Sequence, residues 1–410
     1  MKEKLVIVGG GMAAARLVQE LTTHAPDRYD ITVIGEEKSL PYNRVLLSSL
    51  LAGDTRKTDL VLKPRAWWDE RQVTLIGDKA TGIDVGQGSV RLQVWPAVPF
   101  DTLVLATGSE PIRLPLPGID LSGVLTFRTQ GDVAAMLARA EKDLRVVVVG
   151  GGLLGLEAAY GLSQAGASVT VVHLMDRLME RQLDARAGTM LKLTLESRSI
   201  EVLLNAESVA IEGRGKVEGL RLADARVIPA DLIVMAAGIR PRAELAHDAG
   251  LAVKRGIVVD DSLQTSAPRI YALGECAEHR GLCYGLVGPA YEQAAVLACH
   301  LTGAPARYEG SLLATNLKVS GVNVFSAGDF LGTPDSETIV LTDPDHGIYR
   351  KLVVEDGRLT GAVLLGDTAD ALWYLDLIRS GRSVSSMRPE FVLGRAFCAA
   401  PADGLQAEAA

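Results

Sequence analysis

The sequence contains few cysteines, and none is placed for the chemistry that paired thiols support. Four occur in 410 residues, at Cys276, Cys283, Cys299 and Cys398. They are too few and too widely spaced for a disulfide scaffold, and they include no CxxC pair. We therefore expect no zinc or iron–sulfur site, and no other metal site. We expect most of these cysteines to be buried as small apolar residues.

Long apolar runs and an excess of basic residues are also missing. The most apolar stretch, 146–156, contains four glycines and is far shorter than the roughly 20 residues of a membrane span. The N-terminal run Leu5–Val8 is too short for a signal peptide and ends in glycine. The net charge of −8 argues against a nucleic-acid interface. These absences predict a cytoplasmic protein that binds neither membrane nor nucleic acid.

Glycine, by contrast, is abundant, with 42 residues, and several lie in two ordered turns. In the first, the apolar strand Leu5–Val8 leads into Gly9-Gly10-Gly11, a helix to about Thr23 and a second strand Ile31–Ile34. Continuously apolar strands are typical of a parallel sheet that is covered on both faces.

The same order of elements returns later in the chain. Strand Val146–Val149 precedes Gly150-Gly151-Gly152, a helix Leu153–Gln164 and a strand Val169–Val172. Because both units return to a second strand within about thirty residues, the chain contains a repeat on the scale of a domain. We predict two mononucleotide-binding folds.

The remaining segments predict the domain organisation. Further short strands are expected at 102–106, 232–236 and 269–273. From about residue 312 alternating segments, 322–325, 349–354 and 359–365, indicate an antiparallel sheet, followed by a helix 368–380. We predict an FAD-binding domain of residues 1–110 and 245–311, an NAD(P)H-binding domain 111–244, a small α/β domain 312–400 and a flexible tail 401–410.

The first glycine-rich turn has the pattern of a phosphate-binding loop. Gly9 permits a tight turn, Gly11 lets the backbone approach a pyrophosphate, and Ala14 keeps the helix close to the sheet. The partial positive charge of the helix N-terminus, which includes Met12 and Ala13, favours phosphate. Glu36 follows the second strand at the place of a ribose-binding carboxylate.

The second turn is the stricter form of the pattern, Gly150-x-Gly152-x-x-Gly155, with Leu153 and Leu154 in the first helical turn. Its second strand is followed by His173, where an NAD-specific site usually has a carboxylate. A neutral imidazole accepts a ribose hydroxyl, and a protonated one favours a 2′-phosphate, as would Arg177. The alternative for both is a solvated loop, so these residues leave NADH and NADPH open.

The paired turns resemble the two-dinucleotide flavoproteins that include glutathione reductase and the ferredoxin and rubredoxin reductases. Three more motifs match: LATGS with Ala106, Thr107 and Gly108; AAGIRP with Gly238; and TSAPRIYALGE with Gly274 and Glu275. The resemblance implies FAD as cofactor, with NADH or NADPH as electron donor. It makes Glu275 the carboxylate for the ribityl chain, where most relatives have Asp. Ser48 and Ala80 complete the cofactor-binding candidates.

The disulfide-reductase branch of this superfamily is excluded by chemistry. Those enzymes need a CxxxxC pair, and related peroxidases and oxidases need one Cys, on the helix after the first strand unit. Residues 40–49 contain no sulfur. We therefore expect electrons to leave the flavin for another carrier, or for oxygen.

Three stretches narrow the resemblance within the remaining branch. Residues 42–49, 173–184 and 274–289 are similar to the flavin module of NADH-dependent assimilatory nitrite reductases. That family uses NADH with the same histidine. The sequence has no cysteine-rich or siroheme segment, so we expect it not to reduce nitrite alone. The implied partner is a nitrite or nitrate reductase or a ferredoxin-like carrier.

Five residues have individual expectations. The Arg44 guanidinium matches phosphate and is expected at the FAD pyrophosphate or adenine. The resemblance places Glu157 against the nicotinamide carboxamide, which makes it the candidate catalytic residue. Gly288 and Pro289 open a helix whose N-terminus would face the flavin pyrimidine edge. His279 is either structural or involved in flavin contact or partner docking.

We therefore predict an α/β enzyme with two Rossmann-like domains, as in glutathione reductase, and a small C-terminal domain. Its reaction would be hydride transfer from nicotinamide to flavin, followed by single-electron steps to a partner protein. A ferredoxin- or rubredoxin-type reductase of another pathway and a peroxide-forming oxidase are alternatives. A redox-dependent flavin sensor is a further alternative, disfavoured by the intact turns and Glu157. A homodimer through the C-terminal domain remains open.

Overall fold

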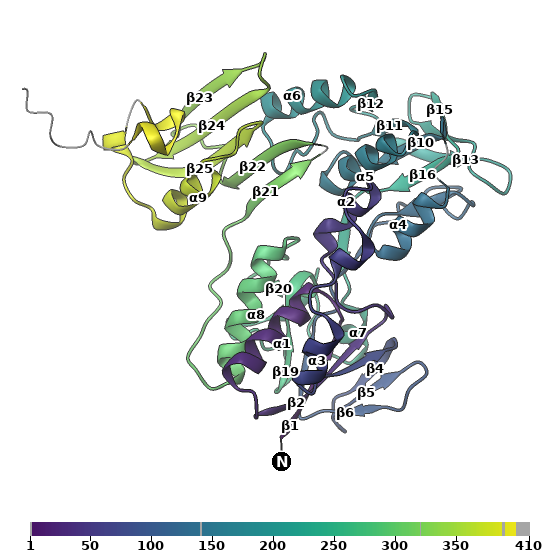
Figure 1. The fold of residues 1–410 in the computed structure, drawn as a ribbon, viewed down its shortest axis with the longest axis vertical. Coiled ribbons are helices and arrows are strands. Elements are labelled where there is room, and N and C mark those ends of the chain that lie inside the picture. Colours follow the sequence, from purple (N-terminus) through teal and green to yellow (C-terminus); the bar gives the residue numbers. More distant parts are fainter. Residues whose placement is uncertain (1, 140–141, 320, 388–389, 399–410) are drawn as a thin grey trace, which may run out of the picture. The chain divides into compact units, whose positions relative to one another are not determined.

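The computed structural model describes residues 2–139, 142–319, 321–387 and 390–398. The chain forms two compact units, one of Met1–Asp176 with Ser199–Ser311 and one of Arg177–Arg198 with Leu312–Ala410 (Figure 1). The predicted tail 401–410 lies outside the described residues.

The first unit contains a five-stranded parallel sheet in the order β19-β7-β1-β2-β3 (Figure 1). Strand β1 pairs with β2 and β7, so the apolar run of β1 lies at the centre of the sheet. Its strands are Glu3–Val8 (β1), Tyr29–Gly35 (β2), Thr74–Gly77 (β3), Thr102–Leu105 (β7) and Ile270–Ala272 (β19).

Helices α1 (Met12–His24) and α8 (Val287–Leu301) contact each other and share one hydrophobic core with this sheet. Short elements follow β2: η1 Arg44–Leu46, α2 Leu47–Leu51, η2 Lys57–Leu60 and α3 Arg65–Glu70. Two small sheets complete this part, with strands β4 Ala80–Asp84, β5 Ser89–Leu92, β6 Val98–Pro99, β18 Ile257–Val259 and β20 Ala277–His279.

The same unit contains a second parallel sheet in the order β12-β11-β10-β16-β9. Its strands are Val124–Thr126 (β9), Arg145–Val149 (β10), Ser168–Val172 (β11), Ile200–Leu203 (β12) and Leu232–Met235 (β16). Helix α5 occupies Leu153–Gln164, as predicted, and α4 occupies Gln130–Leu137. The β-α-β order of the first sheet is thus repeated, which confirms the two predicted mononucleotide-binding folds.

Smaller elements surround the second sheet. A three-stranded antiparallel sheet shares its core. Its strands are β13 Ser208–Glu212, β14 Gly219–Leu222 and β15 Val227–Pro229. Two short strands pair where the chain passes between the sheets, β8 Ser109–Pro111 and β17 Ile239–Pro241. The short helices are α7 Glu244–Asp248 and η3 Gly274–Cys276.

The second unit contains the predicted antiparallel sheet, in the order β21-β22-β25-β24-β23. Its strands are Ala314–Val319 (β21), Val322–Gly328 (β22), Glu337–Asp343 (β23), Ile348–Glu355 (β24) and Arg358–Leu365 (β25). The other elements are α6 Ala185–Glu196, α9 Ala371–Ser380, η4 Ser385–Met387, η5 Glu390–Leu393 and η6 Arg395–Phe397.

Two features of this unit differ from the prediction. The sequence did not predict the edge strands β21 and β23. The residues of β23 are mostly half-buried or exposed, so its side chains do not alternate cleanly between buried and exposed positions. Helix α9 begins at Ala371, not at Thr368, because the Asp367 side chain accepts the Ala369 N–H at 3.0 Å and holds a turn there. The predicted domain boundaries stay a prediction.

A buried cation holds the C-terminal segment of the second unit. Arg350 on β24 is 6% exposed and donates to the carbonyls of Val392 (3.2 Å) and Leu393 (3.0 Å). It also forms ion pairs with Asp367 (2.5 Å) and Asp370 (3.4 Å). A buried guanidinium is tolerated only with several such partners, and here they bind its two terminal nitrogens.

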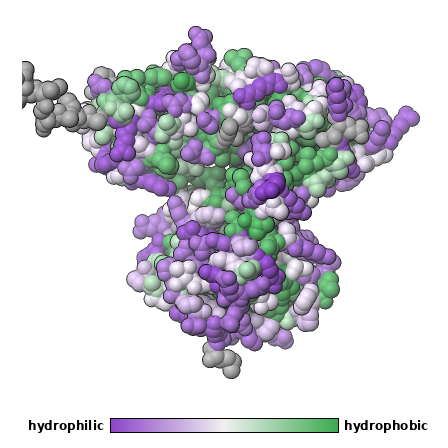
Figure 2. Space-filling view, in the orientation of Figure 1, coloured by the Kyte–Doolittle hydropathy of each residue, from purple (hydrophilic) through white to green (hydrophobic). Residues whose placement is uncertain are grey.

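No helix among the described residues is long and apolar enough to cross a membrane. On the face seen in Figure 2 hydrophilic side chains alternate with smaller apolar areas. The exposed large apolar side chains include Val94 (81%) and Trp95 (58%).

We expect Arg350→Met to lower the free energy of unfolding of the second unit by about 3 kcal/mol, because it removes the hydrogen bonds to the Val392 and Leu393 carbonyls and leaves the half-buried Asp367 and Asp370 without their cation. Arg382→Met is the control, since it removes an exposed pair with Asp376 (2.8 Å) worth at most about 1 kcal/mol. Urea unfolding of both variants measures the difference. Equal losses would show that the Arg350 cluster does not stabilise the unit.

Candidate functional site

Each glycine-rich turn packs closely against the carbonyl group of a residue that follows a neighbouring strand of its sheet. Gly9 has a φ of +125°, and a Cβ there would lie 2.0 Å from the Ala106 carbonyl oxygen. Gly150 has a φ of +123°, and its Cβ would lie 2.2 Å from the Ala236 carbonyl oxygen. Only glycine fits at either position. The two predicted motifs LATGS and AAGIRP therefore supply the carbonyls that the two turns contact.

The helices that follow both turns begin without a side-chain cap. Gly11 is the N-cap of α1 and Gly152 that of α5, and neither end has a side-chain hydrogen bond. A Cβ at Gly11 or Gly152 would meet nothing within 4 Å, so both backbones are open to a ligand. Helix N-termini of this kind bind phosphate through free N–H groups and the helix dipole. Both ends fit a dinucleotide pyrophosphate.

The other predicted residues of these turns lie in the first turns of the helices. Met12, Ala13 and Ala14 open α1, and Leu153, Leu154 and Gly155 open α5. Gly155 is needed for packing, since a Cβ there would lie 2.0 Å from the Gly150 carbonyl oxygen. Gly288 and Pro289 lie in the first turn of α8, which also has no side-chain cap.

The remaining cofactor candidates follow the carboxyl ends of parallel strands, where open α/β sheets bind ligands. Glu36 follows β2, and Ala106, Thr107 and Gly108 follow β7, while Gly274 and Glu275 follow β19. Gly238 follows β16 in the second sheet, with a φ of +111°. Ala80 instead opens β4 and pairs with Leu92.

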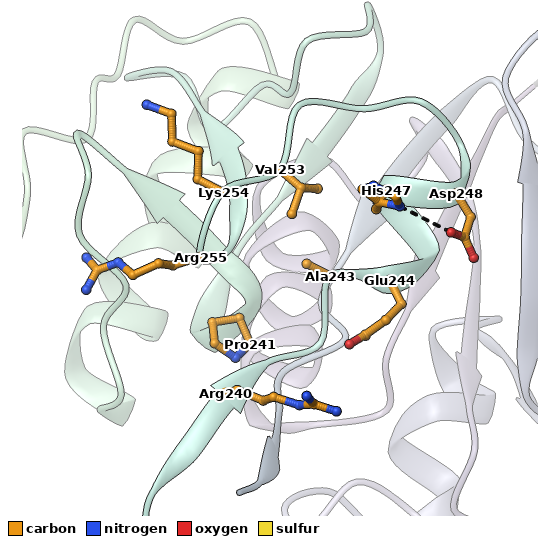
Figure 3. A pocket seen from close by; sticks show the side chains of 9 residues that line it. All are labelled: Arg240, Pro241, Ala243, Glu244, His247, Asp248, Val253, Lys254 and Arg255. Atoms are coloured by element: carbon orange, nitrogen blue, oxygen red, sulfur yellow. Dashed lines mark hydrogen bonds and ion pairs between the residues drawn. The ribbon is translucent and has the colours of Figure 1, made fainter.

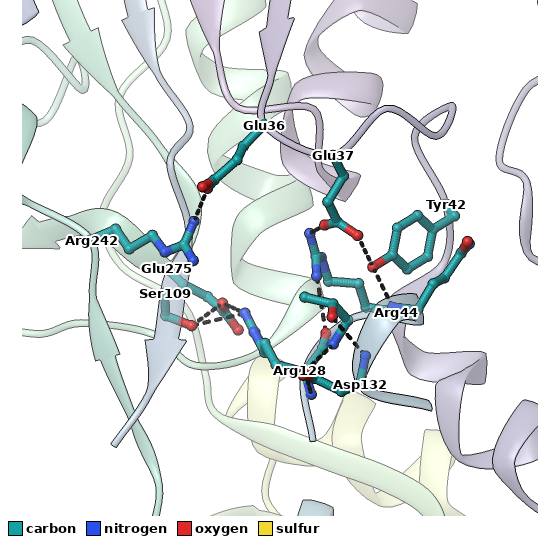
Figure 4. A network of polar contacts seen from close by, with 11 residues as sticks. Glu36, Glu37, Tyr42, Arg44, Ser109, Arg128, Asp132, Arg242 and Glu275 are labelled. Carbon is teal, nitrogen blue, oxygen red and sulfur yellow. Dashed lines mark hydrogen bonds and ion pairs between the residues drawn. The ribbon is translucent and has the colours of Figure 1, made fainter. Parts of the chain in front are cut away.

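Glu275 is the centre of a polar network (Figure 4). Its carboxylate accepts the Ser109 hydroxyl at 2.7 Å and forms a short ion pair with Arg128. Arg128 also donates to Ser109 at 2.8 Å. A carboxylate held in this way is oriented before any ligand arrives, as a ribityl-binding group requires.

Arg44 belongs to a second part of this network. Its guanidinium pairs with Glu37 at 2.5 Å and donates to the Arg128 carbonyl at 3.0 Å. The Tyr42 hydroxyl donates to Glu37 at 2.8 Å and accepts the Gln130 N–H at 3.3 Å (Figure 4). Burial and the neighbouring Glu37 carboxylate raise the pKa of Tyr42, although Arg44 acts in the opposite direction.

Glu36 faces cations in this structure. It pairs with Arg242 at 3.1 Å and with Lys79 at 3.7 Å. The Thr107 hydroxyl donates to the Arg242 carbonyl at 2.6 Å, so this arginine joins the turn after β7 to the predicted ribose carboxylate.

Sequence reasoning missed Arg128, although a signal was present. Thr129-x-x-Asp132 has the spacing of a capping box, which marks the start of a helix. In the structure Asp132 accepts the N–H groups of Thr129 (2.9 Å) and Arg128 (2.8 Å). The cap therefore fixes the backbone from which Arg128 reaches Glu275. Its target could not be predicted, because Glu275 lies 147 residues away.

Glu157 lies in a small pocket of about 20 Å³, lined by Arg44, Leu47, Ser48, Phe127, Arg128, Leu154 and Glu157. Helices α2 and α5 meet beside it at Gly161, where a Cβ would come within 2.8 Å of Leu51. This packing brings Ser48 to Glu157. Burial raises the pKa of Glu157 to about 7, and the hydrogen bond with Ser48 lowers it. The carboxyl group therefore changes charge near neutral pH.

His173 is buried, and its Nδ1 accepts the Gly151 N–H at 3.0 Å. The imidazole thus holds the glycine-rich turn that precedes α5. Nδ1 carries no proton in this arrangement, because it accepts a hydrogen bond. Arg177 belongs to the second unit, where its Nε donates to the Leu183 carbonyl at 3.3 Å.

His279 and Cys276 are buried in the described part of the chain, and the role of His279 stays a prediction. His279 is 1% exposed, contacts Asp261 through Nε2 at 2.9 Å and lies against the Tyr308 ring. Cys276 is buried, and burial raises the pKa of its thiol. The other three cysteines are half-buried and free, so the expectation that most are buried was wrong. The described residues contain no cluster suited to a metal ion.

A second cavity, of about 380 Å³, lies beside β17 and α7 (Figure 3). Its lining includes Arg240, Glu244, His247 and Lys254, and it contains none of the predicted site residues. Of its cations, Arg240 is paired with Glu110 at 2.5 Å. This cavity is therefore not a candidate for the dinucleotide site.

Comparison with known families agrees with this geometry. Residues 3–296 match the pyridine nucleotide-disulphide oxidoreductase family. The chain belongs to this family. Residues 314–382 match the rubredoxin NAD+ reductase C-terminal domain. The residues around both turns fit two dinucleotides, in agreement with this family of oxidoreductases.

Three relatives illustrate the range of the family. The chain is 46% identical over 386 residues to nitrite reductase [NAD(P)H] of Bacillus subtilis, covering 94% of this chain and 48% of that protein. It is 40% identical to the assimilatory nitrate reductase electron transfer subunit of the same organism, with 95% and 51% covered. The chain thus spans about half the length of these relatives.

The third is a solved structure, a ferredoxin reductase from Rhodopseudomonas palustris. It superposes with a TM-score of 0.89 at 27% identity, covering 97% of this chain and 98% of that one. The similarity therefore extends over both units of the chain.

We expect Glu157→Gln to be more stable than the wild type by a margin that grows with pH. The folded-state pKa lies near 7 against a usual 4.5, so the wild type loses stability as pH rises through this interval. The neutral amide does not titrate, so the difference should increase by up to about 3 kcal/mol between pH 4.5 and 7.5. Urea unfolding at both pH values measures it. A difference independent of pH would contradict the buried titration.

Proposed function

We propose that this protein takes electrons from NADH through FAD and passes them to an external redox protein of nitrate or nitrite assimilation. The observation that carries the proposal is the pair of open helix N-termini in one compact unit, with Glu157 in a pocket beside α2 and α5. We also propose the domain boundaries given above, with both dinucleotides bound by the first unit.

The flavin would be held by residues that the structure already orients. The α1 N-terminus after Gly11 suits the pyrophosphate, and Glu36 suits the adenosine ribose. Glu275, fixed by Ser109 and Arg128, suits the ribityl hydroxyls. The N-terminus of α8 would direct its partial positive charge at the ring.

The donor would be bound by the second sheet. The α5 N-terminus after Gly152 suits its pyrophosphate, and Glu157 in the same helix suits the nicotinamide carboxamide. The His173 arrangement supports NADH as donor. An imidazolium, the form that would attract a 2′-phosphate, requires a proton on Nδ1 and thus the loss of the Gly151 hydrogen bond.

Bound FAD supplies uptake of a hydride, with two electrons, from nicotinamide and release of those electrons one at a time. The chain positions the two rings and excludes water from the pocket of Glu157. The thiol nearest in sequence to Glu275 is that of Cys276, which donates to the carbonyls of Leu105 (3.4 Å) and Leu273 (3.3 Å). Its burial disfavours the thiolate, so the electrons are expected to leave the chain.

The acceptor is proposed from the relatives. One is named as an electron transfer subunit of assimilatory nitrate reductase and another as a ferredoxin reductase. An iron–sulfur carrier or reductase subunit is therefore the proposed acceptor.

We expect anaerobic NADH to bleach the flavin of the wild type within seconds. Glu157→Ala should slow this step about 10- to 100-fold while FAD stays bound, because it removes the group that orients the nicotinamide. Stopped-flow absorbance measures the rate. Glu196→Ala, which removes an exposed partner of Lys192, is the control and should not change it. Failure of NADH to reduce wild-type flavin would reject the proposed donor.

The acceptor is tested by comparing NADH consumption in air with that in the presence of an iron–sulfur protein. We expect turnover with the iron–sulfur protein to exceed turnover with oxygen at least about tenfold. Faster turnover in air, with hydrogen peroxide as product, would favour an oxidase instead.

A further inference from the structure

Gln293 is a fully buried polar residue in the middle of α8, with 0% of its surface exposed. A buried amide is costly unless it forms hydrogen bonds. Its Oε1 accepts the N–H of Gly274 at 2.7 Å. The hydrogen bond therefore joins the interior of α8 to the turn after β19.

Gly274 lies where three candidate cofactor segments meet. Its φ is +80°, and a Cβ there would lie 3.2 Å from the Ala13 Cβ in α1 and 4.0 Å from the Ala290 Cβ in α8. A shift of the Gly274 backbone would thus change its packing against both helices. The hydrogen bond from the Gly274 N–H to the Gln293 side chain links this glycine to α8.

Two residues near this hydrogen bond, Glu275 and Pro289, are expected to face the flavin. Glu275 directly follows Gly274, and Pro289 lies four residues before Gln293 in the same helix. Because a helix moves as a rigid body over one turn, the Gln293–Gly274 bond fixes the α8 N-terminus relative to the Glu275 carboxylate.

We propose that Gln293 is a positioning residue for the flavin. It sets the distance between the carboxylate expected to bind the ribityl chain and the helix N-terminus expected to stabilise negative charge on the reduced ring. The inference rests on the proposed placement of FAD in the first unit. It assigns a role to a residue that does not itself touch the cofactor.

The test compares Gln293→Met, Gln293→Glu and Tyr29→Phe in the full chain with FAD. Met keeps the length of the side chain but cannot accept the Gly274 N–H, whereas Glu keeps an oxygen at the same place. Tyr29→Phe is the matched control, since its buried hydroxyl donates to the Leu301 carbonyl at the other end of α8 at 2.7 Å.

For Gln293→Met we expect the FAD dissociation constant to rise about tenfold, the size of one lost buried hydrogen bond. The reduction potential of the bound flavin should become more negative, because the α8 N-terminus stabilises the reduced ring less well. While its buried carboxyl is protonated, Gln293→Glu should keep the FAD dissociation constant within about twofold of the wild type, because an oxygen still accepts the Gly274 N–H. Tyr29→Phe should leave both the dissociation constant and the reduction potential unchanged despite its own loss of stability. Equilibrium FAD titration and dye-equilibrated reduction measure them.

Wild-type values in Gln293→Met, or equal shifts in Gln293→Met and Tyr29→Phe, would overturn the inference. Loss of FAD affinity in both Gln293 variants would also overturn it, because an oxygen acceptor would then not suffice. Failure of the proposed function would look different from these outcomes. NADH would then not reduce the flavin that is bound to the wild-type protein.

Discussion

The close approach of each glycine-rich turn to a neighbouring strand end is the constraint on which the site depends. At Gly9 and Gly150 a Cβ would fall about 2 Å from the carbonyl oxygens of Ala106 and Ala236. This contact brings the turn over the carboxyl end of the sheet and directs the following helix away from it. The free N–H groups of both helices therefore point at the strand ends where ligands bind.

Around the first of these turns, three arginines form ion pairs with three glutamates. Arg128 holds Glu275, Arg44 holds Glu37, and Arg242 contacts Glu36. Pairing orients each carboxylate, and it leaves the guanidinium groups close to where phosphates would lie. Because Arg44 also donates to the Arg128 carbonyl, the turn that begins the second sheet is tied to the first.

Glu157 differs from these carboxylates in the balance of its surroundings, which burial dominates. Its hydrogen bond with Ser48 only partly offsets burial, so its pKa lies near 7. A group that is half ionised at neutral pH can accept a hydrogen bond from a carboxamide without the cost of a permanently buried charge. The packing of α2 on α5 at Gly161 makes this possible, since it closes one side of the small pocket and buries Glu157.

The sequence by itself determined the two β-α-β units, the strands at their centres and the two glycine-rich turns, because these depend on local patterns of apolar residues and glycine. It also shows no thiol at residues 40–49, which is one ground for the proposal that the electrons leave the chain. Only the tertiary structure decided the partners of Glu275, Glu157 and Gly274. Arg128, Ser48 and Gln293 reach them across 147, 109 and 19 positions, and such contacts depend on how the elements pack rather than on any local pattern.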